Sequence, residues 1–365
     1  MHHAARMSKK PSVKSAKKNP RETGVAPLRQ AMLRRLPRRT SATGEIRLAA
    51  VPALAEHYVQ MLGKMFGALG RAFNAEELAH LQQILDKHLN EGWQASPFAK
   101  LVVRYETDPI PKTTLSYNVS VDVSTIADEY AQWTNTRTAP LFGAHPDAKV
   151  MLLAKSLGEP KSVPVLDIGA GTGRNTIPLA EAGFPTDAVE LAPTLAAILR
   201  DDIAKHGLDN VRVFEGDVFD RELGIPAAHY RLLVLAEVVA SHFRDVAQLR
   251  ALFEGAAESL QPGGLLVFSA FVSADGYKPD ALARELSQVL WCCLFTRHDL
   301  AEAVEGQPFD RISDESVAEF EHEHLPAEAW PPTGWFPEWS GGQDLFDLPA
   351  GKAPLELRWL VYRRR

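Results

Sequence analysis

Three glycines alternate along one short stretch, which reads Gly169-Ala170-Gly171-Thr172-Gly173, and Asp167 lies two residues before it. Glycine has no Cβ, so such a stretch lets a ligand lie directly against the main chain. Dinucleotide-binding turns have the spacing Gly-x-Gly-x-x-Gly and hold a pyrophosphate, but Arg174 stands here in place of their third glycine. A carboxylate beside the turn would repel a pyrophosphate and attract an ammonium or sulfonium group. The stretch therefore predicts a site for a positively charged ligand.

Two more acidic residues stand where later strands should end. Glu190 lies 21 residues after Gly169 in an apolar run, and Asp217 follows the next such run. An acidic side chain at the end of the second strand can accept hydrogen bonds from ribose hydroxyls. Because the carboxyl ends of parallel strands meet at one edge of the sheet, we expect both carboxylates to face the glycine turn. Ordinary solvent-facing or turn carboxylates are the alternative.

An acidic residue followed by Gly-x-Gly-x-Gly resembles the first motif of the class I S-adenosylmethionine-dependent methyltransferases. The resemblance implies that S-adenosylmethionine is the cofactor, that Glu190 binds its ribose and that Asp217 accepts a hydrogen bond from its adenine. The segment after the fourth strand, 237–242, is similar to the loop of small-molecule methyltransferases, and 295–300 resembles the tellurite-resistance-like branch. The cofactor-binding residues implied in this way are Asp167, Gly169, Ala170, Gly171, Gly173, Glu190, Leu191, Asp217, Val218 and Glu237.

Methyl transfer needs a base only if the acceptor must first lose a proton. His242 is the candidate, since the pKa of a free histidine is near neutral; a histidine packed on the end of the sheet is the alternative. The segment before the first strand often forms a lid in this family, which points to Tyr130, Trp133 and Arg137. Alternatively, Tyr130 and Trp133 only pack the junction between domains.

Strand-like and helix-like runs alternate between residues 162 and 272 at intervals of about 20–30 residues, as a parallel sheet with crossover helices requires. Together with the resemblance to the class I methyltransferases, this alternation predicts an α/β fold with a doubly wound, seven-stranded Rossmann-like methyltransferase sheet. Apolar spacing before it predicts an N-terminal extension with a helical pair and a β-hairpin. The predicted strands are 165–168, 186–191, 211–215, 231–236, 265–271, 317–324 and 355–363; the predicted helical pair is 51–73 and 74–92, and the hairpin is 101–107 with 113–123.

We divide the 365 residues into a tail (1–45), an N-terminal region (46–144) and a methyltransferase domain (145–365). The first 39 residues carry twelve Lys and Arg and one Glu, and we predict a disordered basic tail through residue 45. The tail is either a tether to nucleic acid or anionic membrane, or a solvated segment without a fixed role. A Trp- and Pro-rich insertion at 325–354 either caps the site or packs along the sheet edge.

Composition limits the compartment and the partners. No apolar run approaches the ~20 residues of a membrane span, so we expect no membrane partner and a cytoplasmic location. Cys292 and Cys293 are adjacent, which suits buried thiols in a reducing compartment better than a disulfide or a metal site. Residues 40–365 carry 28 Lys and Arg against 45 Asp and Glu, so nucleic acid is an unlikely partner. The oligomeric state is left open.

These observations favour S-adenosylmethionine-dependent methyl transfer to a small or medium-sized acceptor, through oxygen, nitrogen or a softer atom. A cofactor-binding scaffold without catalysis is the second hypothesis, because the N-terminal region lies outside the resemblance. A nucleic-acid methyltransferase is the third. The Asn/Asp-Pro-Pro-Tyr motif that many DNA methyltransferases carry after the fourth strand is absent from 236–242, which disfavours it.

Overall fold

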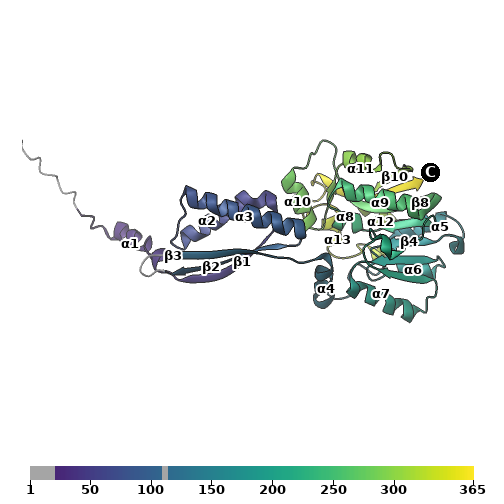
Figure 1. Ribbon diagram of the computed structural model, residues 1–365, viewed down its shortest axis with the longest axis horizontal. Coiled ribbons are helices and arrows are strands. Elements are labelled where there is room, and N and C mark those ends of the chain that lie inside the picture. Colours follow the sequence, from purple (N-terminus) through teal and green to yellow (C-terminus); the bar gives the residue numbers. More distant parts are fainter. Residues whose placement is uncertain (1–20, 109–113) are drawn as a thin grey trace, which may run out of the picture.

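The computed structural model describes residues 21–108 and 114–365 and shows two parts (Figure 1). An elongated N-terminal arm, formed by residues 42–108 and 114–122, projects from a larger α/β body that residues 137–365 form, and α1 (Val25–Leu33) lies at the far end of the arm. The helix α4 (Ile126–Thr136) follows the arm and lies against the body. None of the helices in the described ranges combines the length and apolarity needed to cross a bilayer.

The arm is a three-stranded antiparallel sheet with two helices on one face. The strands are β1 (Ala42–Ala49), β2 (Lys100–Asp108) and β3 (Thr114–Asp122), and the helices are α2 (Ala55–Ala68) and α3 (Ala75–Ala95). Asn74 caps α3 by accepting a hydrogen bond from the Glu77 backbone, as the sequence suggests. The predicted helical pair and β-hairpin are therefore confirmed. Buried leucines of both helices meet the inner side of the sheet in a core of their own.

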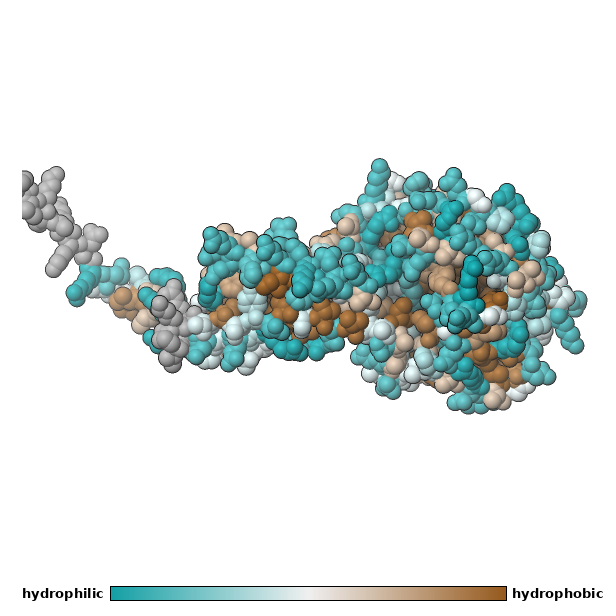
Figure 2. Space-filling model, viewed as in Figure 1, coloured by the Kyte–Doolittle hydropathy of each residue, from teal (hydrophilic) through white to brown (hydrophobic). Residues whose placement is uncertain are grey.

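The disorder predicted through residue 45 is wrong for the part of the tail that the structure describes. Residues Val25–Leu33 form α1, and β1 begins at Ala42 because it pairs along its length with β2. Residues 1–20 lie outside the described residues. No residue of α1 is buried, and Figure 2 shows hydrophobic side chains on its surface. The helix is therefore formed without a core to pack against.

The body contains a twisted sheet whose strands run in the order β10-β11-β8-β7-β4-β5-β6, with the short β9 beside β8. The strands β4 to β9 pair in parallel, and β10 and β11 are antiparallel. The predicted doubly wound, seven-stranded sheet is confirmed along this order, to which β9 adds two residues. The bounds are β4 (Val165–Ile168), β5 (Thr186–Glu190), β6 (Val211–Glu215), β7 (Tyr230–Leu235), β8 (Leu260–Ser273), β9 (Leu294–Phe295), β10 (Phe309–Ser316) and β11 (Leu355–Arg364).

Helices cover both faces of this sheet, with a hydrophobic core on each side. The central strands are buried on both faces, which explains why β7 is a continuous apolar run. The helices are α5 (Ala148–Ser156), α6 (Thr176–Glu181), α7 (Pro193–His206), α8 (Val238–His242), α9 (Val246–Ser259), α10 (Ala281–Val289), α11 (Arg297–Val304), α12 (Val317–His324) and α13 (Phe336–Ser340).

The strand predicted at 317–324 is wrong, because these residues form α12. Ser316 caps the helix by accepting a hydrogen bond from the Glu319 backbone. The alternating pattern that suggested a strand also fits a helix with Val317 and Glu321, four residues apart, on its buried side. The strand at this edge is β10, immediately before the helix. Glu321 accepts hydrogen bonds from the first backbone amides of α5, so it joins the two helices.

The arm contacts the body close to the end of α8. Phe98 stacks on Trp291, with 4.5 Å between ring centroids. The Arg244 guanidinium lies over the Trp93 ring at 4.6 Å and donates a hydrogen bond to the Trp93 carbonyl. The Ala53 backbone donates to Glu285 at 2.8 Å. The arm is therefore joined to segments that also form the main cavity of the body.

Candidate functional site

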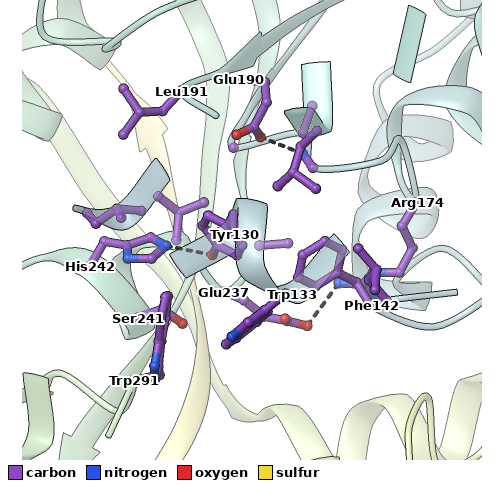
Figure 3. Close-up of a pocket in the computed structure, with 18 of the residues that line it drawn as sticks. Tyr130, Trp133, Phe142, Arg174, Glu190, Leu191, Glu237, Ser241, His242 and Trp291 are labelled. Carbon is purple, nitrogen blue, oxygen red and sulfur yellow. Dashed lines mark hydrogen bonds and ion pairs between the residues drawn. The ribbon is translucent and has the colours of Figure 1, made fainter. Parts of the chain in front are cut away.

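A cavity of about 940 Å³ opens at the carboxyl ends of the central strands. Its floor comes from the loops after β4, β5, β6 and β7, and α4 and the 325–354 insertion form its sides. This edge of an open parallel sheet is where ligands bind in doubly wound folds. Figure 3 shows side chains of α4 and of the segments after β4, β5 and β7 around one space, with Phe142 and Trp291 beside them.

The glycine turn forms the part of the floor after β4. Gly169, Gly171 and Gly173 have φ of +69°, +57° and +96°, a left-handed conformation that side chains rarely adopt. A Cβ at Gly169 would lie 2.3 Å from Val238, and one at Gly173 would lie 2.7 Å from Leu199. These two glycines therefore make room for neighbouring helices. Gly173 is not among the cavity-lining residues, whereas Gly169, Ala170 and Gly171 are.

Glu190 ends β5 and is 4% exposed. One of its carboxylate oxygens accepts a hydrogen bond from the Gly171 amide and the other from the Ala192 amide, both at 2.8 Å. Burial raises the pKa of Glu190, and the hydrogen bonds from these backbone amides oppose the rise. Each oxygen of a carboxylate has two lone pairs, so each keeps one for a ligand hydroxyl. Glu190 thus fixes the glycine turn and still faces the cavity.

The other predicted cofactor residues surround the same end of the cavity. Asp167 is 2% exposed, and one of its oxygens accepts a hydrogen bond from the Thr176 hydroxyl at 2.6 Å. Burial raises the pKa of Asp167 to about 7, while the Thr176 hydrogen bond and the Arg174 charge lower it. Leu191, Asp217 and Val218 also line the cavity. Asp217 accepts a hydrogen bond from the Phe219 backbone at 3.0 Å, which fixes its turn.

Arg174 is a buried cation that joins two segments of the site. It donates to Asp147 at 2.5 Å and to Glu237 at 2.9 Å, and its side chain is 9% exposed. Glu237 stands between β7 and α8 with φ of +64°, and its backbone donates to the Ser269 hydroxyl at 2.8 Å. Burial raises the pKa of Glu237, and the Arg174 charge opposes that rise. The predicted cofactor residue Glu237 lines the cavity, but its carboxylate is held by this arginine.

The predicted lid residues lie on or beside α4, and all three line the cavity. Thr125 caps this helix, and the Tyr130 hydroxyl reaches across to His242 Nε2 at 2.8 Å. The Arg137 guanidinium lies 3.7 Å from the centre of the Trp133 ring, a favourable cation–π contact. The helix therefore rests on α8 through the Tyr130–His242 pair.

His242 lines the cavity, yet its ring nitrogens are poorly placed to take a proton from a molecule there. Nε2 pairs with Tyr130. Nδ1 has no hydrogen-bond partner among the described residues, but it is fully buried. Burial lowers the pKa of His242 to about 4, so the ring is neutral at pH 7. This geometry does not support the simple expectation that His242 is a general base.

The 325–354 insertion lines the cavity, in line with the first alternative left open by the sequence, and it packs against the inner strand β8 rather than along the sheet edge. Pro332, Thr333 and Trp335 line the cavity. Trp339 lines it too, and its ring meets Phe271 of β8 with 5.0 Å between centroids. The Trp339 indole also donates to the Trp291 carbonyl at 2.9 Å.

Arg174, Phe142 and Trp291 are among the lining residues that sequence reasoning missed. In the sequence, Arg174 stands out only because it takes the place of a glycine. A buried arginine at this position requires acidic partners, and these could have been sought. Cys292 and Cys293, next to Trp291, are buried as predicted, and burial raises the pKa of both thiols. Within the described ranges, no group of three or more His, Cys, Asp or Glu side chains is arranged to hold a metal ion.

Comparisons with known proteins agree with this geometry. Residues 165–264 match a family model described as a methyltransferase domain. A solved structure of geranyl diphosphate C-methyltransferase from Streptomyces coelicolor has a TM-score of 0.50 and 14% identity to this chain, over 67% of this chain and all of that one. The chain has the class I methyltransferase fold. At this level of identity, the likeness shows the fold alone.

Curated relatives match a shorter part of the methyltransferase fold. Ribosomal RNA small subunit methyltransferase A of Desulforapulum autotrophicum is 29% identical over 27% of this chain and 34% of its own length. Demethylmenaquinone methyltransferase of Tropheryma whipplei is 28% identical over 32% of this chain and 45% of its own length. The chain thus spans less than half the length of these relatives. They act on an RNA and on a quinone precursor by name, so they leave the acceptor open.

Proposed function

We propose that this protein is an S-adenosylmethionine-dependent methyltransferase that acts on a small or medium-sized acceptor. The observation that carries the proposal is that Glu190, Asp217 and the glycine turn meet in one cavity beneath α4. Their chemistry fits the cofactor: carboxylates for the ribose and the adenine amino group, and bare backbone beside them. A Cβ at Gly171 would be in ordinary van der Waals contact with Phe142, at 3.4 Å, so the φ of +57° and not a lack of room accounts for this glycine.

When bound, S-adenosylmethionine supplies a methyl group on a sulfonium leaving group, so the protein has to provide alignment and manage charge. Glu190 and Asp217 would orient the nucleoside, and Asp167 and Glu190 place negative charge near the cationic end. The helix α4 and the 325–354 insertion would exclude water from the reacting atoms. We propose that His242 acts as a positioning residue, because its Nε2 shares a hydrogen bond with the Tyr130 hydroxyl and so holds α4 over the cavity.

Cofactor binding tests this function directly. We expect S-adenosylhomocysteine and S-adenosylmethionine to raise the melting temperature of the protein, because they bind the folded state, while NAD leaves it unchanged. The NAD control is needed because a pyrophosphate would face the carboxylates near the glycine turn. Thermal denaturation with each ligand measures the shift. Stabilisation by NAD alone would overturn the proposed function.

The affinity for S-adenosylmethionine should increase with pH. The pKa of Asp167 is raised to about 7, so a cation gains the full attraction of this carboxylate only above that pH. Affinity measured by calorimetry should rise about tenfold between pH 6 and pH 8 if binding requires the ionised form. In the free protein the sign is opposite: the raised pKa stabilises the fold at low pH, and this stability is lost as pH rises through about 7.

Asp167→Asn is the control for this pH dependence. The amino group of the cofactor titrates as well, but it does so in both proteins, so their difference isolates Asp167. Equal pH dependence in the wild type and the variant would show that Asp167 does not sense the bound cation.

The cofactor-binding scaffold and the nucleic-acid methyltransferase remain the alternatives to this proposal. The cavity favours a small acceptor, because α4 and the insertion form its sides. A nucleic-acid enzyme would bind RNA or DNA with an affinity that falls steeply as salt increases. Such a salt dependence in a filter-binding measurement would favour that alternative.

A further inference from the structure

We propose that the acceptor is a flat, largely apolar molecule without phosphate groups, which lies on a wall of four aromatic rings. This aromatic wall consists of Tyr130, Trp133, Phe142 and Trp291, all of which line the cavity. The inference rests on the proposed function, because it concerns the molecule that would receive the methyl group. It adds the chemical class of the acceptor, which the sequence and the relatives leave open.

The rings of the aromatic wall contact one another although they come from three segments of the chain. Trp133 and Trp291 have centroids 4.8 Å apart with 42° between their planes, whereas Tyr130 meets Trp291 and Phe142 edge-on, at centroid distances of 5.5 Å and 6.0 Å. An aromatic acceptor would therefore meet some of these rings face-on and others edge-on. Figure 3 shows Trp291 and Glu190 on opposite sides of the pocket, with Tyr130 between them. The wall thus runs from Phe142, beside the glycine turn, through Tyr130 to Trp291.

The backbone and the neighbours of Trp291 fix the position of its ring more firmly than core packing alone requires. Its φ is +59°, an unusual backbone conformation for a residue with a bulky side chain. Phe98 of the arm stacks on it with an angle of 24° between the ring planes, and the Trp339 indole donates to its carbonyl. Unusual backbone conformations that their surroundings enforce cluster at ligand-binding sites. The structure thus fixes this ring before any acceptor binds.

The charges of the cavity exclude an acceptor with phosphate groups. Arg174 is already paired with Asp147 and Glu237, so it cannot serve as a counter-charge without breaking those pairs. Arg137 is a single exposed guanidinium, and one of its faces lies on Trp133. Five carboxylates line the cavity: Asp167, Glu190, Asp217, Glu237 and Asp344. The similar Streptomyces enzyme binds a diphosphate together with Mg²⁺ by title. Among the residues that the structure describes, no three His, Cys, Asp or Glu side chains are grouped to hold such a metal ion, so a diphosphate would face these carboxylates directly.

The test compares three probes on the full-length protein saturated with S-adenosylhomocysteine. The probes are 2-naphthol, which is flat, its saturated analogue decahydro-2-naphthol, and geranyl diphosphate. We expect calorimetry to show 2-naphthol binding about three- to tenfold more tightly than the saturated alcohol, because only the flat ring stacks on the wall. Geranyl diphosphate should not bind. Binding of the diphosphate, or no preference for the flat probe, overturns the inference.

Variants of Trp133 test whether the preference for 2-naphthol over its saturated analogue arises at the aromatic wall. This residue is half-buried on α4, so its replacement is compatible with folding. Trp133→Leu should remove the preference for 2-naphthol, and Trp133→Phe should keep part of it. Trp93→Leu is the matched control, because Trp93 is also half-buried but does not line the cavity. If Trp133→Leu leaves the preference unchanged, the wall is not the binding surface.

The affinity for S-adenosylhomocysteine separates the two proposals. If the protein does not bind this cofactor product, the proposed function fails and the acceptor inference fails with it. If the cofactor product binds but the flat probe shows no preference, the inference alone fails. Both measurements use the same protein, so misfolding cannot produce the second result.

Discussion

Replacing Arg174 with methionine is expected to lower the free energy of unfolding by about 3–5 kcal/mol, because the change leaves buried carboxylates without a counter-charge. Asp147 and Glu237 both receive hydrogen bonds from this guanidinium, and its side chain is 9% exposed. The nearby Asp147 and Glu237 charges raise the pKa of Arg174, while burial opposes them. Chemical denaturation of the purified protein measures the loss.

The loss of stability in Arg174→Met should depend on pH. Without the arginine, Glu237 keeps the burial that raises its pKa and loses the charge that opposes the rise. A carboxyl group with a raised pKa in the folded state stabilises the fold when protonated, so the variant should recover stability as pH falls. A loss that stays constant with pH would contradict this account and indicate that packing alone is affected.

Arg200→Met is the matched control for Arg174→Met. Arg200 also pairs with a glutamate, Glu215, at 2.6 Å, but its side chain is 45% exposed. Exposed ion pairs contribute about 0–1 kcal/mol, so this variant should be nearly as stable as the wild type. A similar loss in both variants would show that burial does not distinguish the two arginines.

Glu190→Ala is expected to reduce the affinity for S-adenosylhomocysteine by at least about tenfold. The change removes the carboxylate proposed to bind the ribose, so the ribose hydroxyls lose their acceptor in the complex. An unpaired buried donor costs about 1–3 kcal/mol, and 1.4 kcal/mol corresponds to a factor of ten in affinity. The Gly171 and Ala192 amides lose their acceptor with or without the ligand, so they lower the stability of the protein instead. Calorimetry gives the affinity, and the melting temperature without ligand gives the structural cost.

Glu215→Ala is the control for Glu190→Ala, because Glu215 ends the neighbouring strand β6 and pairs in register with Glu190. Its side chain is exposed and does not line the cavity, so its removal should leave cofactor affinity unchanged. If Glu190→Ala binds the cofactor product as tightly as the wild type does, our ribose assignment is wrong.

The wrong prediction at 317–324 shows where pattern reading reached its limit. A short segment with alternating polar and apolar residues fits a strand and, equally, a helix with two buried positions one turn apart. The partners of Glu321 decide in favour of α12: the first amides of α5 and the indole of Trp359. These partners come from distant parts of the chain, so no local pattern could reveal them.

The sequence alone determined the proposed cofactor end of the cavity. The strands and the glycine turn form a local pattern in which each acidic residue lies at the carboxyl end of a strand, at the same edge of the sheet. Glu190 and Asp217 therefore lie where their spacing predicts. Only the tertiary structure decided the rest of the cavity. The ion pairs of Arg174 join it to residues 27 and 63 positions away, and the aromatic wall joins segments more than a hundred residues apart, such as 126–142 and 291. Packing between segments this far apart in the chain leaves no periodic signal in a sequence.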